Sequence, residues 1–246
     1  MDKGSGGEWI LYSGERAGNW HINSKAHPGS KLTVQRGVPF KVDKEDLWIA
    51  SLPAMSVLSE VSFTPEIIRQ PSPDETYLTR WEGALLEGLA ASLPKTEELT
   101  KVVEIGTGKG ISLVRLLIGL SLHAMATVWS IDLKECKEAQ EYVVSCQIPS
   151  WRYKLLVGDS TVIGREWENG HLDMIYFDGN HSYEGVIADI EAWYPRLKSG
   201  AVMAFHDYGN KRHQVTKAVD DAMRKRKVKR VARVGYLIAF QKVERG

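Results

Sequence analysis

Acidic and histidine residues follow several short apolar runs in the second half of the chain. Asp132, Asp178 and His206 each come directly after such a run, and Asp159 follows another run after one glycine. Carboxylates accept hydrogen bonds from hydroxyl and amino groups, and imidazole gains or loses a proton near neutral pH. A single residue of this kind often does no more than cap a helix. The repetition indicates a ligand site, because buried polar groups without a partner would destabilise the fold.

A glycine-rich segment lies ahead of these residues. Residues 101–110 read Lys-Val-Val-Glu-Ile-Gly-Thr-Gly-Lys-Gly, and a helical pattern of apolar residues starts at Ile111. This order predicts a strand, a glycine turn and the start of a helix, and glycines let the backbone approach a ligand closely. A short Gly-x-Gly sequence also occurs in ordinary tight turns, so its meaning depends on the polar strand ends that follow it.

Strand and helix patterns alternate from residue 101 onward, which predicts an α/β fold with a mostly parallel sheet between helices. The last two strands have the spacing of a hairpin, so the last strand should run antiparallel to its neighbour. The carboxyl ends of parallel strands meet at one edge of a sheet, and this would bring the polar strand ends together. We expect strands near 101–106, 126–132, 153–158, 172–178, 200–206, 228–232 and 235–242, and helices near 110–122, 134–146, 160–167, 182–196 and 211–226.

The first part of the chain differs from the rest, and we divide the chain into an N-terminal extension at 1–70 and a second domain at 71–246. The extension holds strand-like pieces, such as those at 9–12, 31–34 and 40–42, separated by glycine and proline turns. It can be a small β module, an arm on a partner subunit, a cover over a substrate cleft or an irregular extension. Ser72-Pro73-Asp74-Glu75 predicts the start of a helix, with Ser72 as its N-cap.

The composition points away from secretion and membranes. The chain has 246 residues, a net charge of +1 and two cysteines, so it lacks the disulfide framework of a small secreted domain. It shows no signal-peptide pattern and no stretch near the roughly 20 apolar residues of a membrane span. We therefore expect a cytoplasmic protein with no membrane partner. The near-neutral charge also disfavours nucleic acid as a partner, although residues 224–230 are locally basic.

The segment from about residue 72 to residue 246 resembles the class I S-adenosylmethionine-dependent methyltransferases. Residues 104–110 look like the first motif of that family, Glu/Asp-x-Gly-x-Gly-x-Gly, while Asp132 matches its ribose-binding acid and Asp159 the acid beside the adenine. The resemblance implies a Rossmann-like sheet of seven strands with the last antiparallel, and S-adenosylmethionine as the cofactor. The cofactor-binding residues that it implies are Glu104, Gly106, Thr107, Gly108, Gly110, Asp132, Asp159, Ser160 and Asp178.

A second stretch narrows the resemblance. The sequence Asp-Gly-Asn-His-Ser-Tyr at 178–183, with Phe-His-Asp-Tyr at 205–208, is similar to a subgroup typified by O-methyltransferases for small molecules such as sugars and antibiotics. Related metal-dependent enzymes imply a magnesium (Mg²⁺) site at Asp178, His206 and Asp207. This sequence departs from that pattern at His206, where the metal-dependent relatives have an acid. Nitrogen is a poorer magnesium ligand than oxygen, so either a borderline metal binds there or none does.

A metal-free reaction is the other reading of the same residues. His206 or His181 would then act as the general base, with Asp178 beside them. Both readings stay open at this stage. His206 is favoured over His181, because His181 can also cap the helix that begins near Ser182.

The resemblance implies an O-methyltransferase for a small molecule, such as a sugar or a polyhydroxylated natural product. In-line methyl transfer depends mainly on positioning and on removal of the acceptor's proton. Two alternatives remain: a nucleic-acid methyltransferase, although 178–181 lacks the Asn/Asp-Pro-Pro-aromatic motif, and a non-catalytic module that binds the cofactor. An N-terminal arm of this kind often supports a homodimer in similar enzymes. Asp189 has no assigned role, and we expect it at the surface of its helix.

Overall fold

The computed structural model describes residues 9–12, 19–24, 31–35, 40–42, 47–49 and 78–243. The first five of these ranges are the strands β1 (Trp9–Tyr12), β2 (Asn19–Ser24), β3 (Lys31–Gln35), β4 (Phe40–Val42) and β5 (Leu47–Ile49). The strand-like pieces expected at 9–12, 31–34 and 40–42 thus correspond to β1, β3 and β4. Strands β1, β2 and β3 form an antiparallel sheet of their own.

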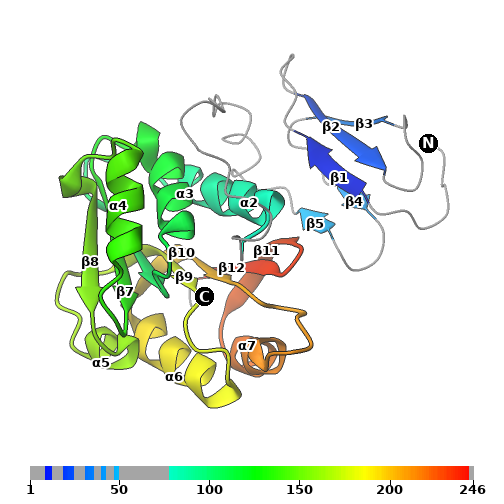
Figure 1. Cartoon of the computed structure of the whole chain (residues 1–246). Helices are drawn as coiled ribbons and strands as arrows, with labels where there is room; N and C mark the ends of the chain where they lie inside the picture. Colours follow the sequence, from blue (N-terminus) through cyan, green and yellow to red (C-terminus); the bar gives the residue numbers. More distant parts are fainter. Residues whose placement is uncertain are drawn as a thin grey trace.

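A larger sheet organises the rest of the described chain (Figure 1). The order β8-β7-β6-β9-β10-β12-β11 gives seven strands in which β12 runs antiparallel to both β10 and β11. This confirms the predicted Rossmann-like sheet with its last strand antiparallel. The strands are β6 (Thr100–Ile105), β7 (Ala126–Asp132), β8 (Tyr153–Val157), β9 (Leu172–Phe177), β10 (Leu197–Phe205), β11 (Val228–Val234) and β12 (Leu237–Lys242).

Helices cover both faces of this sheet, as the alternating pattern predicted (Figure 1). Neighbouring residues of β6 show the two layers, because Val102 packs into the cluster under α2, α3 and α4, while Val103 packs into the cluster under α5, α6 and α7. Both faces of the parallel strands are therefore buried. The helices are α2 (Arg80–Ala91), α3 (Ile111–Gly119), α4 (Lys137–Ser145), α5 (Ser160–Arg165), α6 (Tyr183–Trp193) and α7 (Val215–Arg224).

Helix α2 begins later than the sequence pattern suggested. Its N-cap is Thr79, whose side chain accepts a hydrogen bond from the backbone N–H of Glu82, while the Glu82 carboxylate accepts one from the backbone N–H of Thr79. This reciprocal pair is a capping box. The expected start at Ser72–Glu75 lies outside the described residues, and Leu78 precedes the helix.

The N-terminal part contributes to the large sheet, which the sequence did not predict. Strand β5 pairs antiparallel with β11 through Ile49–Ala232, Trp48–Arg233 and Leu47–Val234, and β4 pairs with β5 beyond it. The sheet of the described residues thus has nine strands. The division of the chain near residue 70 stays a prediction. Among the helices of the described residues, none combines the length and apolar character that crossing a bilayer requires.

Candidate active site

A cleft opens at the carboxyl ends of the central strands. The strand order reverses between β6 and β9, and the connections on the two sides leave a crevice there. The cleft has a volume of about 890 Å³. The polar strand ends that the sequence singled out line it, together with the glycine turn: Gly106, Thr107, Gly108, Asp132, Asp159, Ser160, Asp178, His181, His206 and Asp207. Residues spread over a hundred positions of sequence therefore converge on one edge of one sheet.

The glycine turn forms one wall of the cleft. Gly106 has a φ of +94°, and a Cβ atom there would collide with the carbonyl oxygen of Asp178. Only glycine allows this approach. The Gly106 N–H donates to Ile131 O at 2.8 Å, and the Asp178 N–H donates to Ile105 O at 2.8 Å. The ends of β6, β7 and β9 are thereby held in register. Gly110 also has a positive φ, of +81°, at the start of α3.

Asp132 connects the end of β7 to that turn. Its Oδ2 accepts hydrogen bonds from the N–H groups of Thr107 and Gly108, each at 3.2 Å, and its Oδ1 accepts one from Lys134 N at 3.2 Å. The carboxylate therefore sits against the glycine turn and lines the cleft. This position suits an acceptor for the two hydroxyls of a ribose.

Asp159 lies at the far side of the cleft as the N-cap of α5. It accepts hydrogen bonds from the backbone N–H and the hydroxyl of Thr161, each at 2.7 Å, and these contacts hold the pKa of Asp159 below its usual range. The capping role that a single acid often has is thus present here. Its lining position remains compatible with a ligand contact.

Asp189 is buried rather than exposed, so the expectation of a surface position was wrong. Only 5% of the residue is accessible, and its Oδ1 accepts a hydrogen bond from the Ser160 hydroxyl at 2.5 Å. Burial raises the pKa of Asp189 to about 6, although the Ser160 contact acts against it. The side of α6 that carries Asp189 faces the first turn of α5, and an acid there anchors Ser160 at the cleft.

Glu104 is fully buried and does not line the cleft. Its Oε2 accepts a hydrogen bond from the Ser130 hydroxyl at 2.5 Å, and Ser130 Oγ lies 2.6 Å from Thr107 Oγ1. Burial raises the pKa of Glu104 to about 8, against the lowering effect of the neighbouring serine hydroxyls. In this structure Glu104 supports the glycine turn from the sheet interior.

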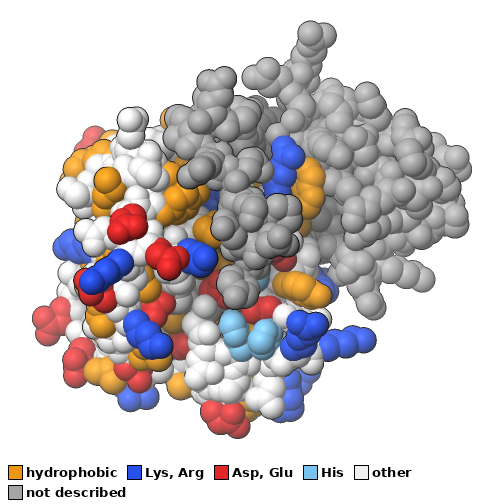
Figure 2. Space-filling model, in the orientation of Figure 1, with side chains coloured by type: hydrophobic (Ala, Val, Ile, Leu, Met, Phe, Trp, Pro, Cys, Tyr) orange, Lys and Arg blue, Asp and Glu red, His pale blue; other side chains and the backbone are white. Residues whose placement is uncertain are grey.

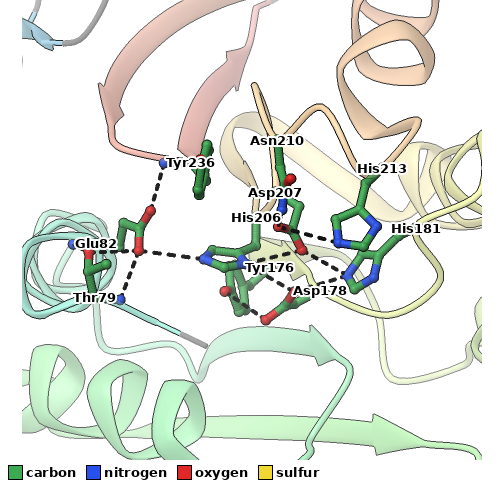
Figure 3. Close-up of polar contacts among 10 residues, drawn as sticks. All are labelled: Thr79, Glu82, Tyr176, Asp178, His181, His206, Asp207, Asn210, His213 and Tyr236. Carbon is green, nitrogen blue, oxygen red and sulfur yellow. Dashed lines mark hydrogen bonds and ion pairs between the residues drawn. The ribbon is translucent and has the colours of Figure 1, made fainter. Parts of the chain in front are cut away.

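The side of the cleft formed by the ends of β9 and β10 holds an acid–histidine cluster, which comprises Glu82, Asp178, His181, His206, Asp207 and His213 (Figure 3). His206 lies at its centre with only 4% of the residue exposed. Its Nδ1 lies 3.4 Å from Asp178 Oδ1 and 3.6 Å from Asp207 Oδ2, and its Nε2 lies 3.6 Å from Glu82 Oε2. Both ring nitrogens therefore face carboxylates.

These contacts fix the charge of His206. Burial alone would lower its pKa, but the carboxylates of Asp178, Asp207 and Glu82 outweigh burial and raise the pKa of His206 to about 12. The ring is an imidazolium at neutral pH and has no lone pair with which to accept a proton. The contacts with His206 and Asn210 outweigh burial at Asp207 and hold the pKa of that carboxyl far below its usual range. The arrangement argues against the predicted role of His206 as a general base.

Glu82 and His213 belong to this cluster but were missed in the sequence. Glu82 is 1% exposed, and its carboxylate accepts hydrogen bonds from Thr79 N at 2.8 Å and from Tyr236 N at 2.6 Å. The sequence Thr79-Arg80-Trp81-Glu82 has the spacing of a capping box and would have marked it. His213 lies in the loop before α7, and no local sequence pattern distinguishes it.

The predicted metal residues Asp178, His206 and Asp207 do lie together, with ligand atoms within 4.8 Å of one another. Their chemistry does not fit magnesium, which is bound in proteins almost entirely by oxygen atoms. The nitrogen in this set belongs to His206, whose two ring nitrogens are both turned to carboxylates. A magnesium ion would have to displace that imidazolium from between Asp178 and Asp207.

Comparison with known proteins agrees with this geometry. A family model described as a methyltransferase domain matches residues 103–208. The uncharacterized protein y4gI of Sinorhizobium fredii (strain NBRC 101917 / NGR234) is 27% identical over 123 residues, which is 46% of this chain and 14% of that protein. The chain thus spans only a small part of this curated relative.

Solved structures show the same fold at low sequence identity. A Corynebacterium glutamicum protein aligns with a TM-score of 0.59 and 19% identity, over 70% of this chain and 84% of its own. The O-methyltransferase TomG from Streptomyces achromogenes aligns with a TM-score of 0.56 and 16% identity, over 70% and 83% of the two chains. At these identities the likeness establishes the fold.

Proposed function

We propose that this chain is a class I, S-adenosylmethionine-dependent methyltransferase, because a family model described as a methyltransferase domain matches residues 103–208. Its acceptor would be an oxygen atom of a small molecule of the sugar or natural-product type. One observation carries the proposal. The acids suited to the cofactor line the same cleft as every member of the acid–histidine cluster except Glu82, so a methyl donor on one side would face an acceptor on the other.

The cofactor half of the cleft is the part formed by β6, β7 and β8. We assign the ribose hydroxyls to Asp132 and the adenine side to Asp159 and Ser160. The glycine turn at 106–110 would receive the methionine portion, because its three glycines have no side chain and let the backbone approach a ligand. S-adenosylmethionine supplies an activated methyl group on a sulfonium sulfur, and the chain's own task is then orientation of the acceptor and removal of its proton.

The acceptor half contains the groups that can take that proton. Asp178 and His181 both line the cleft, and His181 Nε2 lies 3.5 Å from Asp178 Oδ1. The contact with Asp178 raises the pKa of His181, with Asp207 adding to it and partial burial acting against it. We therefore place proton removal on Asp178 or His181. His206 becomes a positioning residue that holds the carboxylates of Asp178, Asp207 and Glu82 around one positive charge.

A structural relative supports a small molecule as the methyl acceptor. TomG is an O-methyltransferase involved in tomaymycin synthesis, and it shares this fold over most of both chains. The near-neutral net charge of the chain also favours a small molecule over nucleic acid, because a methyltransferase for nucleic acid needs to attract a polyanion. A small hydroxylated molecule is the acceptor class that agrees with both.

The test is a methyl-transfer assay with labelled S-adenosylmethionine. The purified chain would be incubated with a small-metabolite extract of the source cell and, separately, with RNA and DNA from the same cell. We expect label in a small-molecule fraction, lost with Asp132→Ala and kept with Glu135→Ala, an exposed acid three positions further on. Label in RNA or DNA alone would overturn the small-molecule assignment, and no transfer to any fraction would favour a cofactor-binding module.

A further inference from the structure

We propose that His181, Asp207 and His213 bind one divalent transition-metal ion of the kind that prefers nitrogen ligands. The site lies in the acceptor half of the cleft, so the inference rests on the proposed function and adds the chemistry that would activate the acceptor. The set differs from the predicted one in two of its three residues, and it contains two imidazoles and one carboxylate in place of one imidazole and two carboxylates.

The distances fit three ligands of one ion. His181 Nε2 lies 3.1 Å from Asp207 Oδ2, and His213 Nε2 lies 3.9 Å from Asp207 Oδ1. One ligand atom from each of the three residues can be chosen so that all lie within 4.8 Å of one another. Ligands bonded to one ion at about 2.0–2.2 Å lie roughly 3–4 Å apart, so small side-chain shifts would close the site.

The orientation of His181 supports an ion rather than a hydrogen bond. Its Nε2 is buried and has no hydrogen-bond partner among the described residues, even though a carboxylate oxygen lies 3.1 Å away. A buried polar atom without a partner is uncommon in a folded protein and calls for a cause. A cation between the ring nitrogen and the carboxylate would satisfy both groups.

The surrounding backbone holds the three residues in place. Asp207 has a φ of +56°, a strained value for a residue other than glycine, and Asn210 Nδ2 donates to its Oδ1 at 2.7 Å. Gln214 joins the loops of the two histidines, since its N–H donates to His181 O at 3.1 Å while its side-chain oxygen accepts from Tyr183 N at 2.9 Å. The rings of His181 and His213 lie 4.4 Å apart.

The two histidines are also accessible, unlike His206. Each is about one-third exposed and lines the cleft, whereas both nitrogens of His206 face carboxylates inside the protein. Figure 2 shows histidine side chains at the surface of this face, between acidic side chains on one side and basic ones on the other. Two imidazoles and one carboxylate select manganese, iron, cobalt, nickel or zinc over magnesium. This donor set therefore avoids the poor fit between magnesium and a histidine nitrogen that the predicted site has at His206.

An ion at this position would act on the acceptor. It would bind the acceptor's oxygen and lower the pKa of that hydroxyl group. The proton would pass to Asp178, whose Oδ1 lies 3.5 Å from His181 Nε2, while the oxygen forms its new bond to the methyl carbon and the sulfonium sulfur departs with the bonding electron pair. His181 then serves as a ligand, and Asp178 is the remaining base.

The test uses the full chain without a histidine tag, stripped of metal by a chelator and titrated with Co²⁺. We expect one Co²⁺ per chain, visible absorption bands of nitrogen-ligated cobalt, and no displacement by excess Mg²⁺. His213→Ala and His181→Ala should each weaken binding at least about tenfold. His171→Ala is the matched control, because His171 is exposed and is not among the residues that line the cleft. The Co²⁺ affinity of this variant should equal that of the wild type.

Binding of S-adenosylhomocysteine in the same samples separates this inference from the proposed function and shows that each variant is folded. Unchanged Co²⁺ affinity in both His213→Ala and His181→Ala would overturn the site, as would the absence of stoichiometric binding by a wild-type chain that binds S-adenosylhomocysteine. If Asp178→Asn lost Co²⁺ binding while His213→Ala kept it in full, the ion would instead lie at the predicted residues Asp178, His206 and Asp207. Failure to bind S-adenosylhomocysteine would count against the proposed function alone.

Discussion

At the scale of single residues, His206 is a buried cation shared by three acids. Its nitrogens lie 3.4–3.6 Å from Asp178, Asp207 and Glu82, beyond good hydrogen-bond distance, so the attraction is mainly that of opposite charges. Removing the positive charge would leave these carboxylates close together and partly desolvated. We therefore expect His206 to matter for the stability of the cluster as well as for its position.

The first prediction concerns this charge. His206→Gln should lower the free energy of unfolding at pH 7 by about 3–5 kcal/mol, because it leaves buried carboxylates without a counter-charge. Urea unfolding measures the change. The double variant Glu82→Gln/His206→Gln should recover part of the loss, since it removes the most buried of the acids. Equal stability of wild type and His206→Gln would mean that the ring is not an imidazolium.

The second prediction concerns Glu104 and pH. Its folded pKa is about 8 against an ordinary value of 4.5, so between these values the folded state holds a proton that the unfolded state has lost. The free energy of unfolding therefore falls as pH rises from 4.5 to 8, and above pH 8 it falls no further on account of Glu104. Glu104→Gln lacks this loss, and its stability relative to wild type should increase by roughly 3–5 kcal/mol between pH 4.5 and pH 9. Parallel pH–stability curves for the two proteins would contradict the buried, protonated carboxyl.

The residues that sequence reasoning missed share a physical cause. Asp189 and Glu82 are acids on helices, and periodicity places them on a face without saying what packs against that face. Their burial depends on Ser160 and on Tyr236, which lie on other elements. His213 sits in a loop, where no period exists. Strand-end residues such as Asp132 and Asp178 were predictable, because the end of a parallel strand has a fixed place in the fold.

At the scale of elements, the glycine turn and the strand ends behave as one unit. The turn after β6 touches the first residue after β9, and Asp132 at the end of β7 binds the N–H groups of the turn. The order of strands and helices could be read from the sequence, because hydrophobic period and glycine positions determine it locally. The start of α2 was not predicted, although Thr79-Arg80-Trp81-Glu82 has the spacing of the capping box that begins this helix.

The third prediction tests this unit. Gly106→Ala should destabilise the protein by at least about 2 kcal/mol, because φ is +94° there and the added methyl group meets the Asp178 carbonyl. It should also abolish binding of S-adenosylhomocysteine. Gly200→Ala is a matched control, with a φ of +81° but no atom within 4 Å of the added carbon and a position outside the cleft lining. Gly200→Ala should lose stability only because alanine disfavours this positive φ, and it should bind S-adenosylhomocysteine as tightly as the wild type.

At the scale of the whole molecule, the N-terminal part and the seven-stranded sheet are linked through the pairing of β5 with β11. The seven-stranded sheet was predictable from the alternation of patterns after residue 101. The pairing of β5 with β11 was not, because strand partners far apart in sequence depend on edges that are left open after the rest has folded. The role of residues 1–70 in acceptor binding or in a homodimer stays a prediction.

The fourth prediction follows from that link. A truncated chain, residues 71–246, should bind S-adenosylhomocysteine with the affinity of the full chain, because the residues assigned to the cofactor all lie after residue 100. It should also self-associate more readily, since β11 loses its pairing with β5 and becomes an open edge. Calorimetry and light scattering measure the two effects. Loss of ligand binding in a folded truncated chain would show that the two parts are not separable.

The central claim is that the cleft at the carboxyl ends of β6, β7 and β8 binds the methyl donor, and calorimetric titration with S-adenosylhomocysteine tests it most directly. We predict one binding site per chain in the wild type. Asp132→Ala should bind about 10- to 100-fold more weakly, because it loses charge-assisted hydrogen bonds to the ribose, and Glu135→Ala should match the wild type. No binding by the folded wild type, or equal binding by Asp132→Ala, would contradict the account.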